Sequence, residues 1–527
     1  MVDCKLERFE SVSVSEIEKV IRNSKSTTSD HDPVPTVVLK KCLLELAPVI
    51  TNITNPGFSS GYFPTVFKHT RVSPLIKATN LDREELKNYR PIAHLKFIAK
   101  TVERVLVNQL QNYLTINNLF AETQSAYRAH HSCETALVRV TNDILLALDK
   151  GDEAVLLLLD YSAAFDTVRH DVLFTRFVEN GICGKALELL KSYFPHRTFS
   201  VIINGYDSDA HSSPYGVPQG SVLGPVAFTL YVAPLYNLIR KHLLNCVMYA
   251  DDTQIYVMFS SKSKNEAIRK LQECMCDIKD WSVHNGLRLN ESKTEIVHFC
   301  SKFRQSDYID HVDIGTTVVK TNVLARDLGV KLDSNLTLSN HVSDVCKSAF
   351  FALHKIGKIR PFLNSKSTEK LVHAHVMSRL DYCNGILMGL PDNQIQKLQR
   401  VQNAAARLIT GTKKRDHISP ILRQLHWLPI RYRIQFKILS LVFLCMNDLA
   451  PSYLQELLIR YRPNRNLRSQ SKSLLVSPKI NTQFYGSRSF QSSAPDLWNS
   501  IPDTIKASKT IDQFKAALKT YYFVLDD

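Results

Sequence analysis

The sequence from Cys246 to Val257 reads Cys-Val-Met-Tyr-Ala-Asp-Asp-Thr-Gln-Ile-Tyr-Val. Residues that favour β-structure stand on both sides of a polar group at residues 251–254, which is the pattern of a β-hairpin. Asp251 and Asp252 would repel each other at such a turn unless a cation or water compensates their charge. A hard divalent cation such as Mg²⁺ prefers carboxylate oxygen ligands. The stretch therefore predicts a hairpin that carries a metal site at its tip, although Asp is also an ordinary turn residue.

A further acidic residue follows an apolar run earlier in the chain. Residues 154–159 read Ala-Val-Leu-Leu-Leu-Leu, which is typical of a strand buried on both faces, and Asp160 follows directly. Alone, Asp160 would simply end a strand ahead of a capping Ser162. The carboxyl ends of strands are, however, where sheet-based sites gather their ligands. Together with Asp251, Asp160 predicts a site for two Mg²⁺ ions about 3.5–4 Å apart, the geometry of nucleotidyl transfer.

Three stretches in order carry a specific resemblance: Leu-Asp-Tyr-Ser-Ala-Ala-Phe-Asp-Thr-Val at 159–168, Gly-Val-Pro-Gln-Gly-Ser-Val-Leu-Gly-Pro at 216–225, and Tyr-Ala-Asp-Asp at 249–252. They resemble motifs A, B and C of the reverse transcriptases of non-LTR retrotransposons (LINEs), close to the jockey-like and chicken-repeat-like elements. The resemblance runs from about residue 10 to the C-terminus. It implies an RNA-directed DNA polymerase that adds deoxynucleotides to a DNA 3′-hydroxyl by two-metal catalysis. It also implies Mg²⁺, or alternatively Mn²⁺, held by Asp160, Asp251 and Asp252.

The same resemblance implies an α+β right-hand polymerase, with a ferredoxin-like palm sheet, α/β fingers, and an α-helical thumb and C-terminal extension. We expect an N-terminal helical segment at 1–65, fingers and palm at 66–335, a helical thumb-like region at 336–430, and an extension of unknown role at 431–527. Helical periodicity predicts helices at residues 37–46, 93–114, 166–180, 263–281 and 395–409. We expect the endonuclease domain of the family to be lacking, because only 28 residues precede Ser29-Asp30-His31, a triplet similar to that domain's last motif.

Five residues are candidates for substrate binding. Lys77 and Arg90 could hold the incoming triphosphate, or could be solvated cations beside a loop. The resemblance makes Phe165 a steric gate against the 2′-hydroxyl, whereas composition alone makes it a core aromatic. Gly220 permits close backbone approach, so that Gln219 can face the nascent base pair.

The resemblance also suggests catalytic and nucleic-acid-binding cations. Lys293 could protonate the departing pyrophosphate, or could be a surface lysine. Arg128 would contact template phosphate. Lys397, Arg400 and Arg407 lie on the outer face of a predicted helix, where they could contact the template–primer backbone or only solvent.

The chain has 527 residues and a formal net charge of +16, which favours a polyanionic partner. The implied partners are an RNA template, a DNA primer and deoxynucleoside triphosphates. Eleven cysteines lack zinc-site spacing, and the N-terminus lacks a signal-peptide pattern. We therefore expect a protein of the nucleus or cytoplasm that is not secreted and meets no membrane.

Two other functions compete. A silent relic of a retrotransposon could bind nucleic acid only, although all three acids and Gln219 are present. A metal-dependent phosphotransferase using Asp160 alone would leave the hairpin and the Gln219 loop unexplained.

Overall fold

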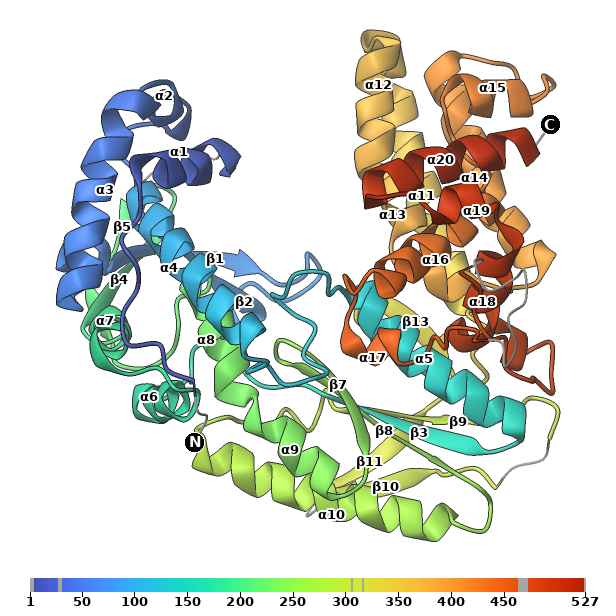
Figure 1. Ribbon diagram of the computed structural model, residues 1–527, viewed down its shortest axis with the longest axis horizontal. Coiled ribbons are helices and arrows are strands. Elements are labelled where there is room, and N and C mark those ends of the chain that lie inside the picture. Colours follow the sequence, from blue (N-terminus) through green and yellow to red (C-terminus); the bar gives the residue numbers. More distant parts are fainter. Residues whose placement is uncertain (1–3, 27–30, 305–306, 315–316, 463–472, 526–527) are drawn as a thin grey trace. The chain divides into compact units, whose positions relative to one another are not determined.

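The computed structural model describes residues 4–26, 31–304, 307–314, 317–462 and 473–525 (Figure 1). The chain forms two compact units, each discontinuous in sequence. Unit 1 comprises residues 1–127, 160–239 and 276–290, and unit 2 comprises residues 128–159, 240–275 and 291–527. The expected boundaries at residues 335 and 430 both fall inside unit 2. In the Ser29-Asp30-His31 triplet, Ser29 and Asp30 lie outside the described residues.

Unit 1 contains a small sheet of strand order β2-β1-β4-β5, with β6 also pairing with β4. The strands are β1 (His69–Ile76), β2 (Tyr89–His94), β4 (Arg197–Ile203), β5 (Tyr206–Asp207) and β6 (His211–Ser213). The helices are α1 (Val14–Asn23), α2 (Thr36–Lys41), α3 (Leu43–Ser60), α4 (Phe97–Ile116), α6 (His170–Glu179), α7 (Gly184–Tyr193), α8 (Leu223–Val232) and α9 (Pro234–Lys241). Helix α1 begins at a capping box, in which Ser13 and Glu16 each bond the other's backbone N–H.

Three predicted helices of unit 1 differ from the structure. The helix predicted at 93–114 is α4, which starts only at Phe97 because Ala93 still pairs with Val72 in the sheet. The helix predicted at 166–180 is α6, which starts at His170, since Asp166 belongs to a turn closed by its N–H on the Ala163 carbonyl. The helix predicted at 37–46 is interrupted at Cys42 and divides into α2 and α3. Two of these differences are late helix starts, and the third is an interruption within the predicted helix.

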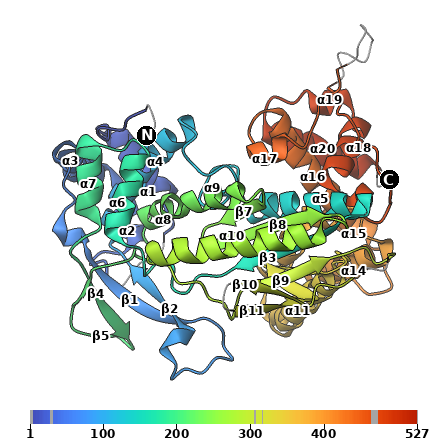
Figure 2. The same ribbon diagram turned by 90° about the horizontal axis from the view of Figure 1, so that it is seen from below.

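Unit 2 is built on a six-stranded sheet of order β10-β11-β9-β3-β8-β7. The strands are β3 (Glu153–Leu159), β7 (Asn245–Tyr249), β8 (Asp252–Phe259), β9 (Glu295–Phe299), β10 (His311–Ile314) and β11 (Thr317–Asn322). Figure 2 shows β3 between β8 and β9, and both neighbours run antiparallel to it. The buried strand predicted at 154–159 is confirmed, except that Leu158 is half-buried. The predicted helix at 263–281 is confirmed as α10 (Lys264–His284).

The rest of unit 2 is mostly helical, apart from the hairpin β12 (Leu324–Asp327) and β13 (Val330–Asp333). The helices are α5 (Cys133–Lys150), α11 (Ser339–Ile359), α12 (Ser365–Val372), α13 (Ser378–Asp381), α14 (Asp392–Thr410), α15 (Ser419–Gln424), α16 (Ile430–Met446), α17 (Ser452–Gln455), α18 (Phe490–Ser500), α19 (Asp503–Lys506) and α20 (Ile511–Leu525). The predicted helix at 395–409 is confirmed within α14, which ends at Gly411 with a φ of 73°. No helix among the described residues is both long and apolar enough to cross a membrane.

One hydrophobic core extends through unit 2, from Ala136 in α5 to Tyr522 in α20. A buried carboxylate joins the C-terminal part of the chain to α5. Asp149 accepts the backbone N–H groups of Asn481 and Thr482, at 3.0 and 2.6 Å, and the Thr482 hydroxyl at 2.8 Å. Gly486 packs so closely there that a Cβ atom would lie 2.5 Å from Asp149 Oδ1. The C-terminal segment is thus part of the core of unit 2.

Candidate active site

The predicted hairpin is present as β7 and β8. Tyr249 pairs with Asp252 across a two-residue turn, Ala250-Asp251, and Ala250 takes a left-handed φ of 58°. Of the polar group between the two β-rich runs, Asp251 lies in this turn and Asp252 begins β8. Thr253 and Gln254 belong to β8 and are buried, because they pair with the central strand β3. Only Asp251 and the exposed Asp252 stand at the turn.

The register of unit 2 brings three strand ends to one edge of the sheet. Leu159, the last residue of β3, pairs with Thr253, and Leu158 pairs with Glu295 of β9. Asp160 is joined directly to Leu159, and Asp252 directly to Thr253. Because adjacent strands are antiparallel, the end of β3 meets the starts of β8 and β9. Each residue predicted to be catalytic lies within two residues of one of these strand ends. Lys293 is exposed and stands two residues before the start of β9.

The donor set at this edge is made of carboxylates, which fits a hard cation such as Mg²⁺. Within unit 1, Asp160 is oriented by Asn290, whose backbone N–H donates to the Asp160 carbonyl at 2.8 Å and whose amide donates to Asp160 Oδ2 at 3.1 Å. Across the described ranges, no three His, Cys, Asp or Glu side chains are gathered into a metal-binding cluster. The chemistry of the donors fits the metal.

A buried polar pair lies beside Asp252 within unit 2. Gln254 Nε2 donates to Asp327 Oδ1 at 2.7 Å, while Asp327 Oδ2 and Gln254 Oε1 have no hydrogen-bond partner among the described residues. Burial, and then the charge of Asp252, raise the pKa of Asp327 to about 8. A small cavity of about 180 Å³ is lined by both Asp252 and Asp327. The sequence analysis missed Asp327, although an inward-facing Gln254 in a hydrophobic strand signalled a buried polar partner.

The Gln219 loop of unit 1 is held by contacts to its own unit. The Gln219 amide donates to both carboxylate oxygens of Asp166, at 3.3 and 3.2 Å. The Gln219 carbonyl accepts the N–H of Ala93 in β2 at 2.8 Å. Gly220 has a φ of 131°, and a Cβ there would lie 2.4 Å from the Ala93 carbonyl oxygen. The close backbone approach at Gly220 is thus to strand β2, and the predicted contact of Gln219 with a nascent base pair stays a prediction.

Asp166 and Phe165 come from the turn that precedes α6. The Asp166 side chain is exposed, yet neighbouring atoms desolvate its carboxyl and raise its pKa, while the Gln219 amide and the Lys77 ammonium oppose that rise. The half-buried ring of Phe165 stacks on Phe228 of α8, with centroids 4.5 Å apart and planes 16° apart. Asp166 was not predicted as a site residue, although it stands next to Phe165 in the motif.

A third missed residue, Glu103 of α4, fixes the start of α8. Its side chain is completely buried. Oε2 accepts the N–H groups of Val222 and Leu223, at 2.6 and 3.4 Å, and Oε1 accepts the Tyr193 hydroxyl at 2.9 Å. Burial raises the pKa of Glu103, and Arg197 with the three donors opposes the rise. An acid on the apolar face of a predicted helix was the available signal.

The two residues predicted to bind the triphosphate, Lys77 and Arg90, lie at one β-hairpin of unit 1. Arg90 is exposed in β2 and pairs with Leu75 of β1. Lys77 follows β1, and its Nζ donates to the Lys87 carbonyl at 2.6 Å. Since side chains alternate along a strand, Leu75 and Lys77 are expected on the same face as Arg90.

The predicted nucleic-acid ligands have differing surroundings in unit 2. Arg400 is exposed on α14. Lys397 is half-buried and donates to Gln394 Oε1 at 3.2 Å. Arg407 donates to the carbonyls of Lys413 and Asp416, so its guanidinium also holds the following loop. Arg128 is partly buried, and desolvation lowers its pKa.

Most of the chain is similar in sequence to known proteins. Residues 76–331 match the family model described as reverse transcriptase (RNA-dependent DNA polymerase). The probable RNA-directed DNA polymerase from transposon X-element of Drosophila melanogaster is 31% identical over 422 residues, which are 78% of this chain and 45% of that protein. The corresponding polymerase from transposon BS is 28% identical, covering 75% of this chain and 44% of the relative. The polymerase from mobile element jockey is 29% identical, covering 56% and 32%.

The chain thus spans less than half the length of these relatives. Among solved structures, apo telomerase from Candida tropicalis, truncated from its C-terminal domain, aligns with a TM-score of 0.35 and 14% identity, over 52% of this chain and 55% of that one.

Proposed function

We propose that this chain, whose residues 76–331 form a domain of the reverse transcriptase family, is an RNA-directed DNA polymerase of a non-LTR retrotransposon. The observation that supports the proposal is the strand register of unit 2, in which the end of β3 at Leu159 lies beside the start of β8, next to Asp251 and Asp252. Its substrates are an RNA template, a DNA primer and deoxynucleoside triphosphates. The charge of +16 suits such polyanions.

The sheet topology supports a polymerase palm. In chain order the elements are β3, helices, β7, β8, α10 and β9, and in space the strands run β9-β3-β8-β7. This is the arrangement of a ferredoxin-like β-α-β-β-α-β fold. We assign this sheet as the palm, the small sheet of unit 1 as fingers, and α11 to α14 as the thumb.

Asp160, Asp251 and Asp252 would hold the two metal ions. Mg²⁺, when bound, supplies charge that activates the primer 3′-hydroxyl and stabilises the leaving pyrophosphate. Lys77 and Arg90 bind the triphosphate, and Lys293 protonates the pyrophosphate. The ring of Phe165, which stacks on Phe228, excludes a ribose 2′-hydroxyl from the nucleotide site.

Other residues orient the strands. Gln219, whose amide is fixed by Asp166, contacts the nascent base pair. Arg128, Lys397, Arg400 and Arg407 contact strand backbones, where each would add a salt-dependent increment of affinity.

Primer extension on an RNA template with Mg²⁺ tests the proposal. Asp251→Asn should lower the rate on the order of a thousandfold, the effect of losing a main electrostatic group from an active site. Asp313→Asn is the matched control, because Asp313 is an exposed carboxylate on the outer strand β10 of the same sheet. Retained activity in Asp251→Asn would remove the site assignment. Inactivity of the native chain, with nucleic-acid binding intact, would favour the silent relic.

A further inference from the structure

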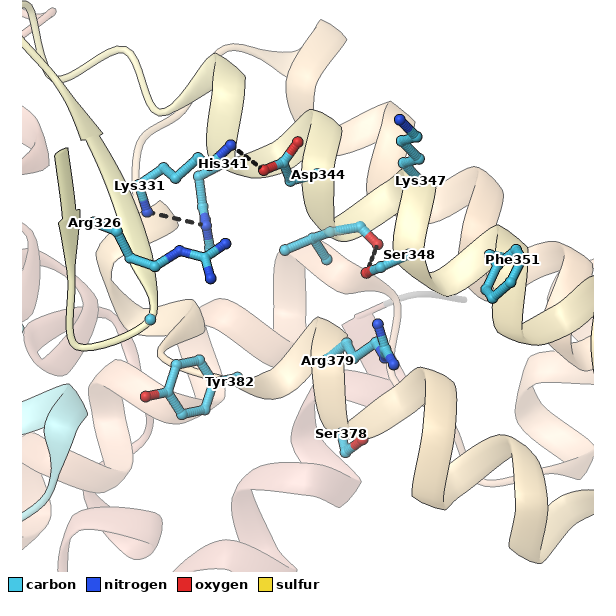
Figure 3. Close-up of a pocket in the computed structure, with 12 residues that line it drawn as sticks. Arg326, Lys331, His341, Asp344, Lys347, Ser348, Phe351, Ser378, Arg379 and Tyr382 are labelled. Atoms are coloured by element: carbon cyan, nitrogen blue, oxygen red, sulfur yellow. Dashed lines mark hydrogen bonds and ion pairs between the residues drawn. The ribbon is translucent and has the colours of Figure 1, made fainter. Parts of the chain in front are cut away.

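A second concave surface of unit 2 shares the β12–β13 hairpin with the cavity beside Asp252. The hairpin, α11 and the segment around α13 enclose a pocket of about 690 Å³ (Figure 3). Arg326 and Gly329 line both this pocket and the small cavity that contains Asp252. The proposed function gives the larger pocket no role.

The larger pocket is strongly basic. Four cations line it, namely Arg326, Lys331, Lys347 and Arg379, against one carboxylate, Asp344. Lys331 pairs with Asp344 at 2.5 Å, which leaves three cations without an ion-pair partner in the part of the chain that the structure describes. Uncompensated cations around a concavity favour an anionic ligand. His341 adds no charge at neutral pH, because burial lowers its pKa.

Two aromatic rings stand among these cations. Phe351 of α11 is 60% exposed and Tyr382 is 43% exposed. The Tyr382 hydroxyl donates to the Leu328 carbonyl at 2.7 Å, and its ring packs against the Gly329 turn, where a Cβ would lie 3.3 Å from Cε1. The Lys355 ammonium lies 4.5 Å from the centroid of Phe351. Tyr382 is therefore a fixed ring, and Phe351 is an exposed ring flanked by positive charge.

We propose that this pocket binds an unpaired segment of nucleic acid, with bases stacked on Phe351 and Tyr382 and phosphates held by Arg326, Lys347 and Arg379. Aromatic rings interleaved with cations are the features by which proteins hold single strands. The volume lies in the range of small-ligand pockets, so it accommodates a few unstacked nucleotides and not a duplex. The inference depends on the proposed function in one respect, namely that the chain binds nucleic acid.

The test measures the affinity of short fluorescein-labelled oligonucleotides by anisotropy, with RNA, DNA and RNA–DNA duplex as separate arms. Phe351→Ala should weaken single-strand binding about tenfold, as expected for one lost base–aromatic stack. Phe351→Trp should restore the affinity, and its added fluorescence should be quenched by the single strand. Duplex binding should change by less than about twofold. The RNA and DNA arms show which strand the pocket prefers.

The charge contribution is tested with Lys347→Gln/Arg379→Gln. This double variant should reduce the slope of log affinity against log salt by about 1.4 for single strands. The control is Lys414→Gln/Arg415→Gln, which removes equal charge from an exposed loop after α14 and should change the slope less. All arms are repeated in the Asp251→Asn background, where binding should persist although extension is lost.

Normal single-strand affinity in Phe351→Ala, or equal weakening of duplex binding, would overturn the pocket assignment. If the chain extends primers while Phe351→Ala binds normally, only the pocket proposal fails. If the native chain neither extends primers nor binds nucleic acid, both proposals fail.

Discussion

Glu103 in unit 1 and Asp327 in unit 2 are both buried carboxyl side chains, but their hydrogen bonding differs. Glu103 is completely buried and has donors on both oxygens, with Arg197 nearby as a compensating charge. Asp327 is 3% exposed, and one of its oxygens has no partner among the described residues. A satisfied carboxyl fixes its surroundings, whereas a half-satisfied one stores unfavourable energy. Glu103 holds the loop that contains Gln219. Asp327 lies beside Asp252, a candidate metal ligand.

The largest effect is expected at Glu103. Glu103→Ala leaves the Tyr193 hydroxyl, the Val222 N–H and the Arg197 charge unpaired inside unit 1. It should lower the free energy of unfolding by about 3–5 kcal/mol, measured by urea unfolding. The control is Glu188→Ala on the surface of α7, where an exposed pair with Lys185 is lost at a cost of less than about 1 kcal/mol. Similar losses in both variants would show that Glu103 does not hold the loop.

Asp327→Asn should raise the free energy of unfolding, by on the order of 2 kcal/mol at pH 7. Because the folded-state pKa of about 8 exceeds the ordinary value of 3.8, the folded chain binds more protons between these values. Native stability therefore falls as pH rises through that window, by at most about 1.4 kcal/mol per pH unit. Asn cannot ionise, so the variant should gain most near pH 8 and little near pH 4.

Thermal unfolding of the native chain and of Asp327→Asn in EDTA, at several pH values, measures the difference in their stability without bound metal. An equal change in melting temperature at every pH would show that the Asp327 carboxyl has an ordinary pKa, and the contrast with Glu103 would then disappear.

The smallest effect on stability is expected at Asp166, which has hydrogen-bond partners but is exposed. Asp166→Asn should change the free energy of unfolding by less than about 0.5 kcal/mol. It should raise the KM for deoxynucleotides about fivefold, because a weaker hydrogen bond then orients Gln219. Steady-state extension kinetics measure this, with Asp171→Asn, at an exposed pair with Arg169, as the control. An unchanged KM would mean that Gln219 needs no orientation by Asp166.

The parts that sequence analysis predicted correctly depend on local patterns. The apolar run at 154–159 is a strand, the β-rich flanks of Asp251 are a hairpin, and Gly411 ends α14. Each follows from the chemistry of a few consecutive residues. The start of α6 was missed because turn contacts around Asp166 replaced the helical pattern.

What could not be predicted depends on partners distant in sequence. The Gln254–Asp327 bond spans 73 positions, and the Asp149–Thr482 contact spans 333. A single sequence does not say which buried polar groups meet. For the same reason, the candidate site residues could be listed from motifs, whereas the groups that hold them in place could not.

The shared core of unit 2 has a consequence for how the chain tolerates truncation. The family match ends at residue 331, but Phe443 stacks on Phe514 and Tyr432 on Tyr522, both far beyond that point. A premature stop codon before α20 would leave residues 76–331 encoded while exposing the apolar surface of α16 that α20 covers. Such a product would aggregate, so a truncating mutation in the last coding segment would remove the folded chain even though residues 76–331 stay intact.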